Sequence, residues 1–307
     1  MRVLCCKFQG RLLAERMKDF KQDNSIKKTQ VPIESRNAWH ISLLRGIVIT
    51  ILIGIFLRIF FIEIYMIPSS SMEPTILSGD FIMVSKMAYG PRVSIPEKFF
   101  KENKTGYLRI KGWNKIKLGD KIVFNFPNYS VSLDSTYKIW GRCIVKRCYG
   151  LPGDTVLIKN EKSGNGNILG KDATDTLQKY NVFPYDSNLK WTIDDYGPLY
   201  VPASGDEVQL TKSTIKMYKD ILRFENPNCT ITDSTIVIDG GPLSRYTFNY
   251  DYYFMLGDNF YNSNDSRYWG FLPDSNIIGK VVMILFSVDK NKYGFRKFRL
   301  NRLFKIV

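Results

Sequence analysis

One long apolar segment constrains this chain of 307 residues more than any other feature, because it needs surroundings that water does not provide. The segment covers residues 41–67 and is charged only at Arg45, Arg58 and Glu63. Its uncharged run over 46–57 would make about 18 Å of helix, and five more residues would extend this to about 25 Å of a hydrocarbon core of about 30 Å, with Arg58 snorkelling to the interface. We predict a single transmembrane anchor; the alternative is a buried helix in a soluble protein.

The charges that flank the anchor predict its orientation. Residues 26–45 contain four lysines and arginines, whereas residues 67–86 contain only one, so the positive-inside rule places the N-terminus in the cytoplasm and the chain from Pro68 onward on the outer side. Forty largely polar residues precede the anchor and no small-x-small motif follows it, which favours a retained anchor over a cleaved leader. No second span is expected, because the apolar run over 281–288 has the length of a strand.

The body of the chain is predicted to be mainly β. Aromatic residues make up 14% of the sequence, and short β-branched and aromatic runs are separated by turn residues, as in an antiparallel sheet. In the middle of the body, glycine, asparagine, aspartate and serine residues separate short strand candidates, which predicts an inserted subdomain. Strands are expected there over 191–194 and 235–239. The predicted order is a cytoplasmic basic arm, the anchor, the first part of a core, the β-rich insertion, the second part of the core and a basic-aromatic tail: 1–40, 41–67, 68–156, 157–250, 251–289 and 290–307.

The formal net charge of +15 is concentrated at the two ends of the chain. Residues 1–45 hold ten lysines and arginines against four acidic residues, and residues 290–307 hold seven against none. Aromatic and aliphatic residues are interleaved with these charges, a pattern typical of segments that bind anionic lipid. Ordinary solvated charge is the alternative for the tail. No helix, finger or RNP motif indicates nucleic-acid binding.

Cysteine and histidine usage argues against a disulfide framework and a metal site. Cys5 and Cys6 precede the anchor and would lie in reducing cytosol. Cys143 and Cys148 share a predicted strand, on opposite faces and about 16 Å apart, which is too far for a disulfide. Whether Cys229 reaches either of them is left open. With one histidine and no Cys-x-x-Cys motif, we expect no metal and no cofactor.

A serine and a lysine are the candidates for catalytic chemistry. The only histidine, His40, precedes the anchor, so a Ser-His-Asp triad is excluded, and Ser71 and Lys146 remain as nucleophile and base. A lysine acts as a base only when neutral, and holding an ordinary amine neutral at pH 7 costs about 4.6 kcal/mol unless burial lowers its pKa. On a strand, Lys146 shares a face with Ile144 and Cys148, which can exclude water from it. Taken singly, a loop serine and a solvated lysine are the simpler interpretations.

Five sequence blocks change that balance, because they occur in one order and at compatible spacing. They are Ile67-Pro68-Ser69-x-Ser71-Met72-x-Pro74-Thr75 with Gly79-Asp80; Gly119-Asp120-x-Ile122-Val123-Phe124; Lys146-Arg147-x-x-Gly150-Leu151-Pro152-Gly153-Asp154; Gly257-Asp258-Asn259; and Asn262-Ser263-x-Asp265-Ser266-Arg267-Tyr268-Trp269-Gly270. In these blocks, and in Arg58-x-Phe60-x-x-Glu63 at the end of the anchor, the chain resembles bacterial type I signal peptidases. The resemblance covers roughly residues 45–90, 117–156 and 252–282.

The resemblance implies a role for each matching polar residue. Ser71 would be the acylated nucleophile, and Lys146 the general base that later activates the deacylating water. The Ser69 hydroxyl and the Ser71 backbone N–H would form the oxyanion hole. Ser263 would hydrogen-bond to the Lys146 amine and orient it.

Two ion pairs and an apolar groove complete the implied site. Asp258 would pair with Arg147, and Asp265 with Arg267, as scaffolding that holds the last block against the lysine strand. A peptide would bind as an added strand with small residues at the first and third positions before the cut, which implies Ala-x-Ala-like cleavage sites. The apolar candidates for the pocket walls are Ile67, Pro68, Met72, Ile76, Ile144 and Val145.

The implied protein is a membrane-anchored serine endopeptidase that removes signal peptides from exported preproteins. It would lie in the bacterial inner membrane with its catalytic domain on the periplasmic face, and its partners would be preprotein signal peptides and membrane lipid, with the translocation machinery nearby. One alternative is an inactive, membrane-tethered β-rich binding protein of the same fold. A second, a soluble Ser-Lys protease such as a self-cleaving repressor, fits neither the anchor nor the absence of a DNA-binding N-terminus.

The last block departs from the family's usual form. At Phe260-Tyr261, where an Arg-Asp pair commonly follows Gly-Asp-Asn, polar scaffolding is lost without a change to the Ser-Lys pair. We therefore expect activity to survive with altered local packing. Ser70 also replaces a common glycine, which matters only if that position needs a positive φ.

Overall fold

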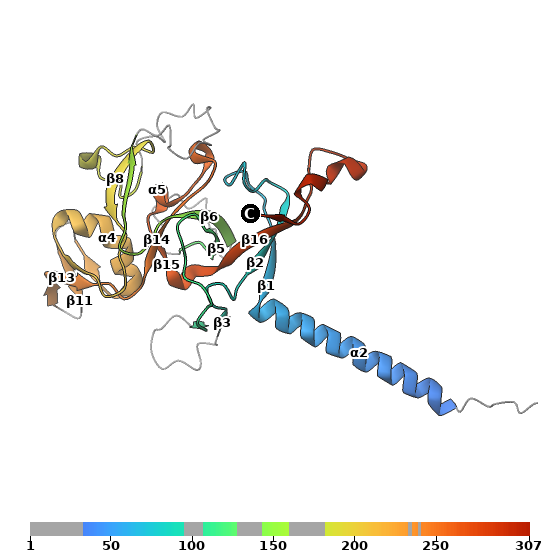
Figure 1. Cartoon of the computed structure of the whole chain (residues 1–307). Coiled ribbons are helices and arrows are strands. Elements are labelled where there is room, and N and C mark those ends of the chain that lie inside the picture. Colours follow the sequence, from blue (N-terminus) through green and yellow to red (C-terminus); the bar gives the residue numbers. More distant parts are fainter. Residues whose placement is uncertain (1–32, 95–106, 128–142, 160–181, 233–234, 239–240) are drawn as a thin grey trace, which may run out of the picture. The chain divides into compact units, whose positions relative to one another are not determined.

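The computed structural model describes residues 33–94, 107–127, 143–159, 182–232, 235–238 and 241–307, as Figure 1 shows. The chain divides into two compact units, Met1–Ile55 and Phe56–Val307. Most of the predicted basic arm, including Cys5 and Cys6, lies outside the described residues.

The N-terminal part of the described chain is a long helix, α2 (Ile33–Phe60). Its segment Trp39–Phe60 is 22 residues long, and none of its most apolar stretch is buried within the protein. At 1.5 Å per residue the segment spans about 33 Å, enough to cross a hydrocarbon core of about 30 Å. The predicted anchor over 41–67 therefore contains a helix of membrane-spanning length, but the helix ends at Phe60 and the prediction extends too far.

Strand β1 (Ile62–Met66) occupies the end of the predicted anchor. It pairs antiparallel with β2 (Asp80–Ser85), which satisfies its backbone groups through a neighbour. Glu63, one of the three charged residues of the predicted anchor, forms an ion pair with Lys86 at 2.8 Å. The predicted helix is wrong over these residues. Five residues are too few for the pattern of apolar and polar side chains to distinguish a strand from the end of an apolar helix.

The body is built on one eight-stranded antiparallel sheet, in the order β1-β2-β16-β5-β6-β14-β15 with β17 beside β16. Its remaining strands are β5 (Lys121–Asn125), β6 (Cys143–Gly150), β14 (Tyr252–Leu256), β15 (Leu272–Pro273), β16 (Ile277–Ser287) and β17 (Lys305–Ile306). This arrangement confirms the mainly β fold. The register of β16 against its neighbours shifts at several points, and such bulges bend a strand and let a sheet curl (Figure 1).

Two clusters of buried side chains fix the part of the sheet that matters for the site. One cluster contains Ile67, Met72 and Ile76 together with Val145 of β6, so it packs the segment between β1 and β2 against the sheet. The other contains Trp269, Phe124 and Met255 among others and joins β5 and β14 to the short helix α5 (Ser266–Trp269). Fully burying one large apolar side chain contributes about 1.5–3 kcal/mol, so these clusters hold the segments firmly.

The predicted insertion contains a 14-residue helix, α4 (Lys212–Glu225), as well as strands. Thr211 caps it by accepting from the Thr214 backbone N–H, and its buried face includes Ile215, Tyr218 and Leu222 at helical spacing. This helix was not predicted, although its Thr211 cap and the helical spacing of its apolar residues are signals in the sequence. The described part of the predicted insertion is therefore mixed in structure.

Short strands make up the rest of the insertion and its surroundings. The strand expected over 235–239 is confirmed, whereas the one expected over 191–194 is wrong, because pairing with β7 begins only at Asp195. The remaining strands are β3 (Arg92–Ser94), β4 (Tyr107–Arg109), β7 (Thr155–Lys159), β8 (Asp195–Tyr200), β9 (Glu207–Gln209), β10 (Thr230–Ile231), β11 (Ile236–Ile238), β12 (Gly241–Leu243) and β13 (Arg245–Thr247). Single turns of 3-10 helix are η2 (Ser187–Leu189), η3 (Phe260–Asn262), η4 (Asp274–Asn276), η5 (Gly294–Lys297) and η6 (Leu300–Arg302).

The basic-aromatic tail, residues 290–307, docks on the sheet in part. β17 pairs with β16. Arg302 is only 6% exposed, and its guanidinium donates to the two carboxylate oxygens of Asp80 at 3.0 and 2.6 Å. Tyr293 and Phe295, in contrast, are more than nine-tenths exposed. The tail thus has a structural part and a free surface part.

Candidate active site

Ser71 lies in the segment that connects β1 to β2, and a backbone hydrogen bond joins the two ends of this segment. The Ile67 N–H donates to the Asp80 carbonyl at 2.9 Å. Met72 and Ile76 fill the segment from inside, at 1% and 0% exposure. Packing therefore fixes the backbone around the serine, while the serine itself is only half-buried.

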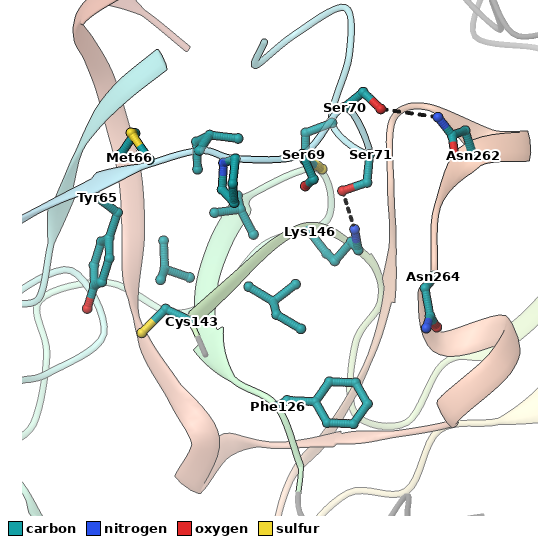
Figure 2. Close-up of a pocket in the computed structure, with 16 residues that line it drawn as sticks. Tyr65, Met66, Ser69, Ser70, Ser71, Phe126, Cys143, Lys146, Asn262 and Asn264 are labelled. Carbon is teal, nitrogen blue, oxygen red and sulfur yellow. Dashed lines mark hydrogen bonds between the residues drawn. The ribbon is translucent and has the colours of Figure 1, made fainter. Parts of the chain in front are cut away.

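Lys146, on β6, meets the serine: its Nζ donates to Ser71 Oγ at 2.6 Å (Figure 2). The lysine is 2% exposed, and burial lowers its pKa to about 8, because a charged amine without water around it is costly. Asp265 and Asp258 oppose this shift of the pKa from longer range, but each is already paired with an arginine. The arrangement brings a hydroxyl and an easily deprotonated amine into direct contact.

The last sequence block supports the serine segment. The Asn259 N–H donates to the Ser71 carbonyl at 3.1 Å, and Asn259 Nδ2 donates to the Ser70 carbonyl at 3.2 Å. Asn262 Nδ2 donates to Ser70 Oγ at 3.1 Å. Gly257 approaches the Ser71 carbonyl so closely that a Cβ at this position would overlap it. These contacts fix the segment that carries the serine against the segment that follows β14.

The two ion pairs expected as scaffolding are both formed. Arg147 donates through Nε and Nη2 to the two oxygens of Asp258, each at 2.6 Å. Arg267 makes the same bidentate pair with Asp265, donating through Nε and Nη2 at 2.9 and 2.8 Å, and both side chains are fully buried. Asp265 also accepts the Gly257 N–H at 3.1 Å. Neither carboxylate contacts the dyad, which fits a structural role.

A cavity of about 360 Å³ opens beside the dyad (Figure 2). One wall is formed by residues 65–72 and another by the first half of β6, residues 143–146. β14 pairs with β6 only from Arg147 onward, and within the described sheet β1 pairs on one side only, with β2. Both walls therefore present strand edges to which an extended peptide can add.

Five of the six apolar residues predicted for the pocket line this cavity: Ile67, Pro68, Met72, Ile144 and Val145. Ile76 does not, and this part of the prediction is corrected. Its N–H donates to the Met72 carbonyl in a turn that directs the side chain into the core cluster, where it is fully buried.

Eight lining residues were not among the predicted site residues: Tyr65, Met66, Ser70, Val123, Phe126, Cys143, Asn262 and Asn264. Tyr65 and Met66 fall within the predicted anchor and before the first motif block, which begins at Ile67. Cys143 gave no signal of a site role, because strand alternation predicts that it lies on the face opposite Lys146. Asn264 occupies a spacer position of the last block.

One protein family matches this chain over most of its length. The family model for signal peptidase, peptidase S26, matches residues 40–286. The chain belongs to the signal peptidase family. Signal peptidase I of Buchnera aphidicola subsp. Acyrthosiphon pisum is 31% identical over 278 residues, 82% of this chain and 78% of that protein. Signal peptidase I of Pseudomonas aeruginosa is 30% identical over 243 residues (75% and 67%), and that of Helicobacter pylori strain 26695 is 30% identical over 257 residues (80% and 80%).

Membership confirms the resemblance and the enzyme prediction: the chain is a signal peptidase, an enzyme of the serine protease class. The match over 40–286 takes in the apolar helix, all five blocks and the insertion between them. It ends before the tail.

In this signal peptidase, Phe260 replaces a residue that is commonly charged. Its ring lies under the Arg267 guanidinium, 3.9 Å from ring centroid to Cζ, and its carbonyl accepts from Arg267 Nη2. A cation over an aromatic face is stabilised by about 0.5–2 kcal/mol. The altered packing therefore helps to hold the arginine that binds Asp265.

Ser263 does not make the hydrogen bond predicted for it. Its Oγ is buried and has no hydrogen-bond partner in the described part of the chain, and the Lys146 amine contacts Ser71 instead. Gly257 packs so tightly on this serine that a Cβ there would overlap its side chain. Ser70 is not at positive φ, so the replacement of the family's common glycine introduces no backbone strain.

Proposed function

We propose that this signal peptidase cleaves exported preproteins after Ala-x-Ala-like sites, with Ser71 as nucleophile, Lys146 as general base and an acyl-enzyme intermediate. The proposal is carried by the 2.6 Å contact between Lys146 Nζ and Ser71 Oγ, made by an amine that is almost wholly excluded from water. A serine hydroxyl is a weak nucleophile until an adjacent base takes its proton, and a desolvated amine can do so.

In the first half-reaction the neutral Lys146 amine takes the hydroxyl proton as Ser71 Oγ bonds to the scissile carbonyl carbon. Negative charge develops on the carbonyl oxygen, where the Ser69 hydroxyl and the Ser71 N–H would stabilise it. Ser69 lines the cavity beside Ser71, as this role requires. The C–N bond then breaks, and the leaving amine takes the proton from the Lys146 ammonium, so the signal peptide is left as an ester of Ser71.

In the second half-reaction water replaces the departed amine. The Lys146 amine, neutral again, takes a proton from the water as its oxygen attacks the ester carbon. Collapse of the second tetrahedral intermediate breaks the bond to Ser71 Oγ, which recovers its proton from Lys146. The signal peptide leaves as a carboxylate, and the dyad returns to its starting state.

Substrate size is limited by the walls next to the dyad. Ile67, Met72 and Val145 are buried residues that also border the cavity, so they form a fixed apolar surface. Small apolar side chains fit such a surface without displacing packed residues, whereas larger ones require repacking. The geometry thus favours alanine next to the cut.

Cleavage of a synthetic precursor with one Ala-x-Ala site tests the proposed function. The solubilised chain should cut once, directly after the second alanine, as identified by mass spectrometry of both products. A precursor of the same length with leucine at both positions is the matched control and should stay intact. Failure to cut the alanine precursor, or a cut elsewhere in it, contradicts the proposal.

The rate should depend on pH through the Lys146 amine. Its pKa is lowered to about 8, and only the deprotonated amine accepts a proton, so kcat/KM should rise as pH increases through about 8 and then level off. Below about pH 7 it should fall about tenfold per pH unit, because the neutral fraction does. Measurements between about pH 6 and about pH 10 check this. A profile that is still rising beyond about pH 10 would mean a lysine of ordinary pKa.

Gly257→Ala should impair catalysis although it changes neither side chain of the dyad. The added Cβ would overlap the Ser263 side chain and the Ser71 carbonyl, which must then move, and overpacking of this kind costs about 1–3 kcal/mol. We expect kcat to fall at least about tenfold, because small displacements of a nucleophile are costly. Gly241→Ala is the control, since nothing lies within 4 Å of the new Cβ and kcat should not change. Equal kcat for both variants argues against a fixed serine segment.

We place the catalytic unit at the outer face of the bacterial plasma membrane, with the N-terminus in the cytoplasm. The flanking charges and the apolar segment Trp39–Phe60 support this placement. In the exposed part of the tail, Phe295 stands beside Arg296 and Lys297, a combination suited to anionic lipid. Stronger binding to anionic than to neutral vesicles, and protease protection of the N-terminal arm in intact cells, test the two parts of this placement.

A further inference from the structure

One side of the cavity carries two polar side chains next to Met66. Figure 2 shows Tyr65 of β1 and Cys143 of β6 together on one side of the cavity, with Ser71 and Lys146 on the other. The Tyr65 phenol interacts with the Cys143 thiol and with the Glu63 carboxyl. A phenolic hydroxyl can both donate and accept hydrogen bonds, so this end of the cavity differs in kind from the apolar walls beside the serine.

The Cys143 thiol is held by a second neighbour. It donates to Asn125 Oδ1 across the strand pair at 3.6 Å, so it stays at the cavity wall. It is also exposed, whereas Cys148 on the same strand is fully buried. A bound peptide would therefore contact the Tyr65 and Cys143 side chains at this end of the cavity, which we call the polar end.

Spacing assigns this polar end to one residue of a bound peptide. Cys143 lies three residues before Lys146 on β6, about 10 Å along the strand. In an extended peptide the first and third residues before the cut point to the same side, about 7 Å apart. With the first residue at Ser71, the side chain of the third residue reaches toward Tyr65 and Cys143, and that of the first cannot.

We propose that this end of the cavity is a subsite that favours a hydroxyl-bearing side chain, threonine or serine, as the third residue before the cut, with Tyr65 as the residue that recognises it. The proposal rests on the proposed function and adds a chemical preference to it. In a wholly apolar subsite a threonine hydroxyl would lose its hydrogen bonds to water and gain none from the protein. Valine would then be preferred over threonine. The Tyr65 hydroxyl provides the replacement hydrogen bond here.

Threonine and valine have the same shape, so a pair of precursors that differ only by this substitution isolates the hydroxyl. With the full chain in detergent, kcat/KM for Thr-x-Ala should exceed that for Val-x-Ala. Tyr65→Phe should lower the Thr/Val ratio roughly three- to tenfold, the range of one neutral hydrogen bond. The ratio is the readout, because effects of the variant on folding or on general binding cancel in it. Cys143→Ala should lower the ratio in the same direction, and it serves as a second variant if Tyr65→Phe does not fold.

Tyr293→Phe, which makes the same chemical change at a residue that is 91% exposed, is the matched control and should leave the ratio unchanged. A wild-type ratio of one or less, or a ratio that Tyr65→Phe and Cys143→Ala leave unaltered, overturns the inference. If Ala-x-Ala is still cut in that case, the proposed function stands. If none of the three precursors is cut, the proposed function fails and the inference fails with it.

Discussion

Replacing Ser71 with alanine should lower kcat for an Ala-x-Ala precursor by roughly 10⁴-fold or more, because no acyl-enzyme can form without the hydroxyl. Lys146→Ala should have an effect of similar size, since the serine would then keep its proton in the attacking step. The double variant should be no slower than the slower single variant, because two residues that act as one unit are strongly non-additive. Steady-state and single-turnover cleavage of the same precursor measure all three.

Loss of activity must be separated from loss of fold. Lys146→Met keeps most of the side-chain volume and removes the buried amine, so it should be at least as stable as the wild type and yet inactive. Ser187→Ala and Lys159→Ala change exposed residues of the same two types and should leave kcat unchanged. A Lys146→Met enzyme that still cuts would exclude the lysine as base, and wild-type rates in Ser71→Ala would exclude the serine as nucleophile.

The chemistry of the site could be predicted from the sequence because it depends on residue types in short blocks. One histidine placed before the anchor excluded a triad, and the blocks around Ser71 and Lys146 identified a different pair. The structure brings these two residues, 75 positions apart in the sequence, to 2.6 Å. The pairing of Arg147 with Asp258 could be predicted in the same way, because both residues stand in blocks that carry the family resemblance.

The walls of the cavity could not be predicted as well, because they depend on where each element begins. Residues 62–66 are apolar enough to extend a helix, and only pairing with β2 makes them a strand. Tyr65 was therefore assigned to the membrane when it in fact lines the cavity. The helix α4 was missed for a different reason, since its signal is the spacing of its apolar residues and not its composition.

Side-chain direction set a further limit on prediction. Ile76 and Met72 are both apolar and four residues apart in the same segment, yet Met72 borders the cavity and Ile76 lies entirely in the core. Ser263 stands in the expected block but packs on Gly257 instead of reaching Lys146. Differences of this kind are set by contacts between segments distant in sequence, which a motif does not contain.

The tail makes a buried ion pair whose loss should strongly lower the stability of the fold. Arg302 binds both carboxylate oxygens of Asp80, which is fully buried, and also donates through Nη2 to the Thr75 carbonyl at 2.9 Å. Asp80 accepts the Leu77 N–H at 2.8 Å as well, so the pair ties the tail to the segment that carries the serine. Arg302→Met should lower the free energy of unfolding by about 3–5 kcal/mol, because it leaves a buried carboxylate without its partner. Urea denaturation measures this loss.

A double-mutant cycle distinguishes a specific pair from general disturbance of the tail. Asp80→Asn removes the other charge, and the Asp80→Asn/Arg302→Met double variant should lose less than the sum of the two single losses, with a coupling of about 0.5–3 kcal/mol. Arg296→Met, at an exposed position of the same tail, should change stability by less than about 0.5 kcal/mol. Since Thr75 lies four residues after Ser71, kcat of the folded Arg302→Met enzyme should fall more than KM rises. Strictly additive losses, or wild-type stability of Arg302→Met, would mean that the tail is only an appended surface segment and that the serine segment is held without it.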